Sequence, residues 1–144
     1  MNRALAAVSL VLVAVGLTTA CAPRSSEVEE YVVTTVSTGS TIAVADLVGD
    51  ADARLFTIVC PYELPEDIAA RLGVSATDLP DLSTRDDAQA LVAVTADGVE
   101  ATEFPRDRVD LCADGTWPAF PSDDTATAAV TRNADGVYVV TRTS

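Results

Sequence analysis

Histidine and lysine are both absent from this chain of 144 residues, so its nine basic side chains are all arginines. Without histidine the chain has no imidazole general base, no His-containing catalytic triad and no His-ligated zinc or copper site. The 22 acidic residues give a net charge of −13. Phosphate backbones repel so acidic a protein, and we therefore expect no nucleic-acid partner. The length allows one modest domain.

Several motifs that carry chemistry are also missing. The chain has no glycine-rich phosphate loop, no nucleophile elbow and no paired-cysteine metal motif. Acidic pairs occur at Asp86-Asp87 and Asp123-Asp124, but neither lies in a calcium-binding loop with its central glycine and terminal glutamate. We therefore assign no catalytic residue, no metal site and no cofactor.

The N-terminus begins with a short positive start, Met1-Asn2-Arg3, and continues with residues 4–17, in which only Ser9 is polar. This apolar run has the length of a signal-peptide core and is shorter than the roughly 20 residues that a membrane-spanning helix needs. Small residues at positions 18–20 then precede Cys21. The pattern predicts a signal peptide over residues 1–20.

This segment resembles the start of a bacterial lipoprotein precursor, in which small residues precede an invariant cysteine. The resemblance implies that a diacylglycerol is attached to Cys21 and that cleavage occurs just before it. The membrane would then be a partner through the N-terminal lipid, because two acyl chains anchor a protein stably. An uncleaved anchor over residues 4–22 and simple secretion are the alternatives. Each of the three places the chain from residue 22 onward outside the cytoplasm.

Two further cysteines, Cys60 and Cys112, remain once Cys21 is assigned to the lipid. An even pair in an oxidising compartment predicts one disulfide. The bridge would close a loop of about 50 residues, which is worth on the order of 4 kcal/mol in the chain-entropy model. We expect it to supply a large share of the stability of so small a domain.

The chain divides into an N-terminal extension and one domain. Residues 21–40 are predicted to be the lipidated cysteine and a tether, because residues 22–30 combine proline, serine and three glutamates. The β-branched segment 31–36 (YVVTTV) favours a strand within this stretch. Residues 41–144 are predicted to form a single domain.

Local signals predict a strand over residues 55–60, which are mostly apolar, and a helix directly after it. Pro65 suits the first helical position, and Gly73 suits the position just after the last. Apolar residues that recur every four positions form the predicted buried stripe of this helix: Leu64, Ile68 and Leu72.

Two hairpins follow the helix. Asp97-Gly98 separates residues 90–95 from residues 99–104, and a similar turn separates two later β-branched runs, 126–132 and 137–143. The proline-broken loop between the hairpins carries two aromatics, Trp117 and Phe120, which either form an exposed protein-binding loop or fold back over the sheet. The predicted fold is therefore α+β, with a small antiparallel sheet of hairpins, one main helix packed on it and one disulfide.

The order of these pieces resembles a family of small bacterial envelope lipoproteins of the actinobacterial type. The matching pieces are Cys60-Pro61-Tyr62 after the strand, Leu72-Gly73 at the end of the helix, and Phe104-Pro105-Arg106 after the first hairpin. The resemblance implies the fold and an address in the cell envelope. It implies no activity.

The predicted disulfide brings a candidate binding site together. It would hold Tyr62 and Glu63 near Arg106 and Arg108, because a few extended residues separate each of them from a bridged cysteine. Two arginines beside a tyrosine form a fork suited to a carboxylate or a phosphate. The alternative interpretation is that both arginines pair with neighbouring acidic side chains as ordinary surface ion pairs.

Three functions remain open from the sequence. The leading hypothesis is a lipid-anchored, extracytoplasmic binding or accessory module with a partner protein in the envelope. The second is a small envelope enzyme, or a thiol-redox protein, that uses Cys60, Tyr62 and Arg106. Its redox form is motivated by the resemblance of Cys60-Pro61-Tyr62 to the Cys-Pro-Tyr-Cys motif of glutaredoxins, although Glu63 occupies the position of the second cysteine. The third is a purely structural component of the envelope.

Overall fold

The computed structural model describes residues 25–49 and 52–143, so the predicted signal peptide and Cys21 lie outside the described part. Its helices and strands, in chain order, are α1 (Ser25–Val36), β1 (Thr41–Ala43), β2 (Leu55–Val59), α2 (Pro65–Leu72), β3 (Ala88–Val94), β4 (Val99–Pro105), β5 (Val109–Asp110), β6 (Phe120–Pro121), β7 (Thr127–Arg132) and β8 (Tyr138–Arg142). Short 3-10 helices follow β1 (Val44–Leu47) and α2 (Ala76–Asp78).

The strands form two four-stranded sheets, with the orders β4-β3-β2-β6 and β1-β7-β8-β5. All pairs are antiparallel except β5 with β8, which is parallel. The predicted α+β class is confirmed. The strands divide into two sheets because β1 pairs with β7 and β5 pairs with β8, so both short strands extend the second hairpin and not the first.

Both predicted hairpins are present. β3 and β4 meet at Asp97-Gly98, where Gly98 has a φ of 141° that an L side chain rarely adopts. The turn between β7 and β8 is held by Asn133, whose Oδ1 accepts hydrogen bonds from the backbone N–H groups of Asp135 (3.0 Å) and Val137 (2.9 Å). Residues within each turn, Gly98 in the first and Asn133 in the second, therefore determine which strands pair.

Helix α2 begins at Pro65 and ends before Gly73, as predicted, and Gly73 takes the left-handed conformation with a φ of 69°. Ile68 and Leu72 are buried, but Leu64 is 49% exposed. The prediction that Leu64 belongs to the buried stripe is wrong. Leu64 is the N-cap residue, with extended backbone, so its side chain leaves the helix before the helical periodicity begins.

Helix α1 corrects two predictions about the N-terminal extension. Residues 31–36 are helical and not a strand, and the described part of the predicted tether, from residue 25, is helical as well. Val32 and Val36 are fully buried, and Val28 packs against the same core one turn earlier. Because the three valines are four residues apart, they share one helix face. Their burial in the core overrides the β propensity of this segment.

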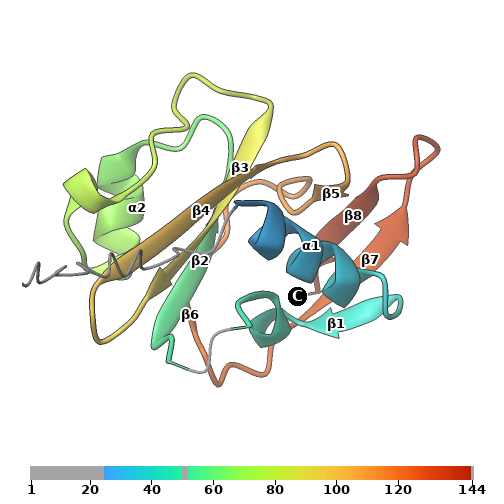
Figure 1. The fold of residues 1–144 in the computed structure, drawn as a ribbon, viewed down its shortest axis with the longest axis horizontal. Coiled ribbons are helices and arrows are strands. Elements are labelled where there is room, and N and C mark those ends of the chain that lie inside the picture. The colour runs from blue at the N-terminus through green and yellow to red at the C-terminus, as the bar shows by residue number, and fades with distance from the viewer. Residues whose placement is uncertain (1–24, 50–51, 144) are drawn as a thin grey trace, which may run out of the picture.

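Alternate side chains of the first sheet point to its two faces. On one face Ala90 and Val92 pack with Ile68 and Leu72 of α2. On the other face Leu91 packs in the larger core, which also contains α1 and the second sheet. Figure 1 shows α2 beside the first sheet and α1 crossing at the junction of the two sheets. The first sheet is therefore covered on both faces, and each helix covers one of them.

The two aromatics of the proline-broken loop are buried. Trp117 packs edge-to-face on Phe120 with ring centroids 6.0 Å apart, and its Nε1 donates a hydrogen bond to the carbonyl of Leu111. Of the two alternatives for this loop, the structure has the one that folds back over the sheet. β6, which consists of Phe120 and Pro121, is an edge strand, the position in a sheet that tolerates proline.

Candidate functional site

The predicted disulfide is confirmed. Cys60 directly follows β2 and Cys112 follows β5, with an S–S distance of 2.07 Å and a Cα–Cα distance of 5.6 Å. The bridge links the end of β2, in the first sheet, to the segment that follows β5, a strand of the second sheet. Because both sulfurs are consumed, neither Cys60 nor Cys112 presents a thiolate in this state.

Glu63 is buried below the surface of this region. Its Oε1 accepts a hydrogen bond from the backbone N–H of Cys60 (2.8 Å), and its Oε2 lies 2.7 Å from Nη2 of Arg71. The contact with Arg71 is electrostatic, since that nitrogen makes no hydrogen bond to any residue the structure describes. Only 5% of the Glu63 side chain is exposed. The carboxylate therefore supports the loop from below and lies away from the surface.

Arg106 forms the fork expected of it, but with a carboxylate of the chain itself. Its Nε and Nη2 lie 3.1 and 2.8 Å from the two carboxylate oxygens of Asp110, and its Nη1 donates to the carbonyl of Asp86 at 3.1 Å. This bidentate geometry uses the recognition face of the guanidinium. Of the two interpretations of Arg106, a fork for a ligand or an ordinary ion pair, the structure has the ion pair.

Arg108 points to a different partner, helix α1. Its Nη2 lies 2.9 Å from the carboxylate of Glu30, and its Nη1 lies 3.3 Å from that of Glu29. The hydrogen bond to Glu30 and the charges of both glutamates raise the pKa of Arg108 above its ordinary value. Arg106 and Arg108 thus serve separate ion pairs, and the four predicted site residues do not converge on one ligand.

Tyr62 is the member of the predicted set that remains available at the surface. Its side chain is 64% exposed, and its neighbour Leu64 is exposed as well. Tyr62 also has a φ of 68°, a left-handed value that no other described residue except glycine adopts. Such a conformation costs a large side chain about 1–3 kcal/mol and persists only where the surroundings enforce it.

Three contacts hold the backbone around Tyr62 in place. We call the segment from Pro61 to Pro65 the Tyr62 knuckle. Its backbone is tied by the hydrogen bond from Tyr62 N to the carbonyl of Leu82 (2.9 Å) and by the buried side chain of Glu63. The disulfide fixes its start at Cys60. The knuckle is therefore a preformed apolar projection on a rigid base.

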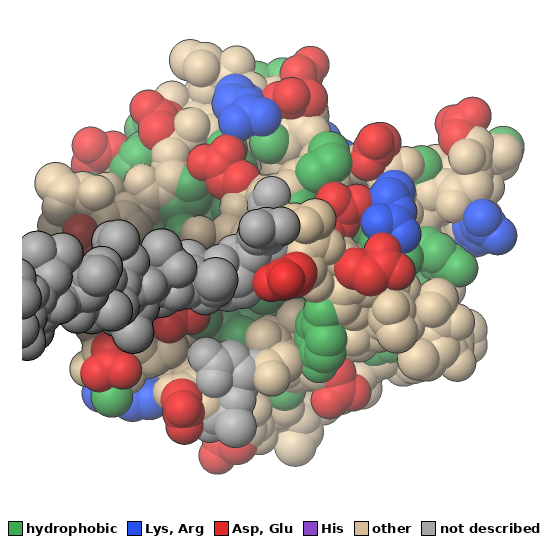
Figure 2. Space-filling model, in the orientation of Figure 1, with side chains coloured by type: hydrophobic (Ala, Val, Ile, Leu, Met, Phe, Trp, Pro, Cys, Tyr) green, Lys and Arg blue, Asp and Glu red, His purple; other side chains and the backbone are tan. Residues whose placement is uncertain are grey.

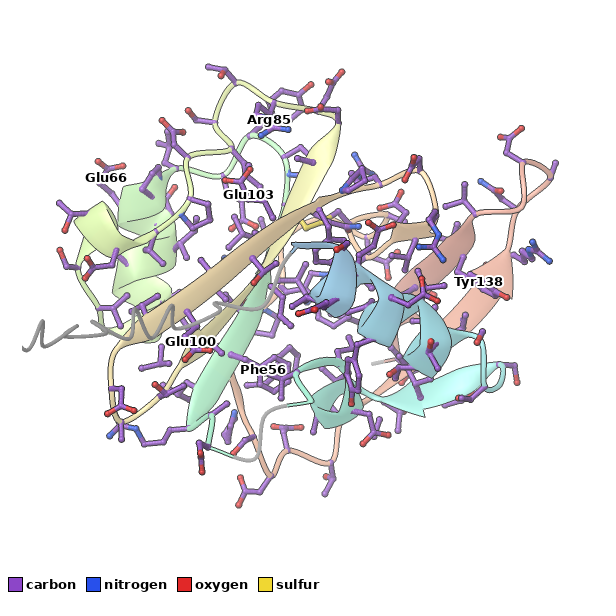
Figure 3. All side chains as sticks on the ribbon, in the orientation of Figure 1. Phe56, Glu66, Arg85, Glu100, Glu103 and Tyr138 are labelled. Carbon is purple, nitrogen blue, oxygen red and sulfur yellow. A yellow bond between two sulfur atoms is a disulfide. The ribbon has the colours of Figure 1, made fainter. Side chains whose placement is uncertain are left out.

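Acidic side chains border the knuckle. Glu66 and Asp67 occupy the first turn of α2 and are exposed, and Figure 3 shows Glu66 at the outer side of that helix. On the face shown in Figure 2, carboxylates are widely scattered and arginines are few. The projection thus has an apolar centre with negative charge beside it.

Sequence reasoning missed that Leu64, two residues after Tyr62, is exposed as well. The signal that identifies it is Pro65, because a proline at the first helical position makes the preceding residue the N-cap.

No cluster of three metal-ligating side chains occurs in the described ranges, 25–49 and 52–143. Within the same ranges no helix has the length and apolarity required to cross a membrane. Comparison with protein-family models, curated proteins and solved structures gives no match for the chain.

Proposed function

We propose that the protein is a lipid-anchored, extracytoplasmic binding module that engages a partner protein of the cell envelope through the Tyr62 knuckle. The observation that carries this proposal is the exposure of Tyr62 in a strained backbone conformation on a rigid base. A strained, exposed aromatic contributes nothing to the core, and strain of this kind clusters at functional positions.

The chemistry of the knuckle specifies the partner surface. Tyrosine is enriched at the energetic centre of protein interfaces, and Leu64 extends the apolar area beside it. Glu66 and Asp67 favour positive charge around the contact. The partner surface is therefore an apolar socket that accepts one aromatic ring, with lysine or arginine at its rim.

The proposed location rests on the N-terminal sequence. Residues 1–20 and Cys21 have the features of a lipoprotein precursor, and the disulfide accords with an oxidising compartment. The intact mass of the membrane-extracted protein tests this part. A mass that begins at Cys21 and includes a diacylglycerol supports it, and a mass that retains residues 1–20 contradicts it.

The binding role is tested by capture from detergent-solubilised membranes of the native cells, using the full lipidated chain as bait. Tyr62→Asn is the informative variant, because asparagine tolerates the left-handed conformation and the fold is kept. Asp97→Asn is the matched control, since it alters an exposed turn outside the knuckle. We expect a protein that wild type and Asp97→Asn retain and Tyr62→Asn loses. The same set of proteins on all three baits would contradict the proposal.

A further inference from the structure

A groove of about 340 Å³ lies between α1 and the first sheet, and none of its lining residues belongs to the Tyr62 knuckle. Its floor is formed by two cross-strand pairs of β3 and β4, Leu91 with Thr102 and Ala93 with Glu100. Because alternate residues of a strand share a face, all four point toward α1. The volume lies in the range of small-molecule sites.

One end of the groove is held in shape by a close contact. The hydroxyl of Tyr31 donates a hydrogen bond to the carbonyl of Asp46 (2.9 Å), which fixes the ring over the turn after the 3-10 helix. Gly49 in that turn has a φ of 62°, and a Cβ atom there would lie 2.7 Å from the Tyr31 ring. Glycine therefore permits the ring to pack against the backbone, and the groove is preformed.

The lining combines apolar side chains with acceptors of hydrogen bonds. Val28, Val48, Leu91 and Ala93 provide the apolar surface, and the described residues that line the groove include no arginine. Glu100 makes no ion pair or side-chain hydrogen bond with any residue in the described ranges, and Figure 3 shows it on β4. A second carboxylate, that of Glu27, lies on the α1 side of the same groove.

We propose that this groove binds a small organic cation, namely a protonated amine or quaternary ammonium carried on an apolar body. The apolar body covers Leu91 and Val28, and the cationic head lies at Glu100. The exposed ring of Tyr31 provides an additional face for a cation. The Glu100 carboxylate would repel an anionic ligand, and a neutral ligand would gain no Coulomb attraction from it.

The test uses three probes with one apolar body and different heads: 4-phenylbutylammonium, 4-phenylbutanol and 4-phenylbutyrate. Each is titrated into the full chain in detergent, and binding is read from the backbone amide shifts of Ala93, Glu100 and Thr102. We expect the ammonium to bind about tenfold more tightly than the alcohol, and the carboxylate to bind most weakly. We also expect the affinity of the ammonium to fall as salt is added, because the groove is open to solvent.

The variant Glu100→Gln keeps the shape of the side chain and removes its charge. It should reduce the affinity of the ammonium about tenfold, to that of the alcohol, and leave the alcohol unchanged. Asp97→Asn is the control, since it removes one charge from the same hairpin outside the groove. Equal affinities of the three probes, a preference for the carboxylate, an absence of shifts at millimolar probe, or an unchanged Glu100→Gln variant would each overturn the proposal.

Discussion

Glu63 and Arg71 form an ion pair of 2.7 Å beneath the loop in which Tyr62 is exposed. The pair joins the knuckle to the second turn of α2, while the disulfide at Cys60 joins it to the segment after β5. The left-handed backbone of Tyr62 is therefore held from two directions. The account of function depends on this arrangement, because a partner would meet the tyrosine on a backbone of fixed conformation.

Replacement of Glu63 by alanine should lower the free energy of unfolding by about 3 kcal/mol. The variant leaves the largely buried guanidinium of Arg71 without its counter-charge and the N–H of Cys60 without its acceptor. Urea denaturation followed by circular dichroism measures the change. Glu66→Ala, at an exposed position of the same helix, is the control and should change little. A loss below about 1 kcal/mol for Glu63→Ala would show that the ion pair does not support the knuckle.

Removal of the disulfide should cost about 4 kcal/mol, because the sequence separation of 52 residues gives a large loop-closure entropy in the unfolded state. The double variant Cys60→Ala, Cys112→Ala and the reduced wild-type protein should unfold at the same urea concentration. Both midpoints should lie well below that of the oxidised protein. Coincident midpoints for oxidised and reduced wild type would contradict the prediction.

Replacement of Tyr62 by glycine should not destabilise the fold, and should stabilise it by up to about 1 kcal/mol. The gain comes from relief of the left-handed strain, and the greater entropy of glycine in the unfolded chain offsets part of it. Thermal and urea unfolding measure the difference. Leu64→Gly provides the comparison, because Leu64 has a φ of −84° and should show no such gain. A marked loss of stability in Tyr62→Gly would mean that the ring packs on the protein and not on a partner.

The pKa of Asp87 lies below its ordinary value, chiefly because the Arg85 side chain donates hydrogen bonds to its carboxylate. A folded-state pKa below the unfolded one stabilises the protein above the unfolded value, and this contribution is lost as the pH falls through the folded value. Arg85→Gln should therefore return the pKa of Asp87 toward normal. Carboxyl chemical shifts in a pH titration report it.

Asp81 is the internal control for this titration. Its pKa is also lowered, but by hydrogen bonds from Ser83, so Arg85→Gln should leave it in place. Ser83→Ala should raise the pKa of Asp81 through loss of the side-chain hydrogen bond and leave that of Asp87 unchanged. If either variant shifted the pKa values of Asp81 and Asp87 together, the overall electrostatic field, and not these local hydrogen bonds, would determine the two pKa values.

Helix α1 should behave as part of the domain. Val32→Ala should cost about 2 kcal/mol, because it opens a cavity at a fully buried position. Arg108→Gln should cost less, and its effect should shrink at high salt, since Arg108 and Glu30 are exposed to solvent, although Glu29 is half-buried. Amide hydrogen exchange across α1, with global unfolding measured in parallel, gives both results. A Val32→Ala variant as stable as wild type would indicate that α1 acts as a tether.

Elements with local determinants were predictable from the sequence. Helix α2 has Pro65 and Gly73 at its ends, and the first hairpin has Asp97-Gly98 at its turn. The disulfide followed from the cysteine count once Cys21 was assigned to lipid. Elements that depend on distant contacts were not predictable. The segment 31–36 has β propensity, and only its burial against both sheets makes it helical.

The same distinction applies to the candidate site. Asp110 lies four residues from Arg106, so that ion pair was foreseeable as a local one. Glu29 lies 79 residues from Arg108, and the sequence carried no sign of the contact. The left-handed backbone of Tyr62 depends on Leu82, which the fold brings in, and on the burial of its neighbour Glu63, which the fold also determines. The exposure of the ring could therefore be established only in the folded structure.

The central claim, that the Tyr62 knuckle binds a partner protein, is tested most directly by photo-cross-linking in the native cells. A photo-activatable phenylalanine analogue is placed at position 62 of the full chain and, as the control, at position 97. The account predicts a discrete cross-linked species from position 62 that is absent from position 97 and is lost when Leu64→Ser is added. The same cross-links from both positions, or none from position 62, would contradict the account.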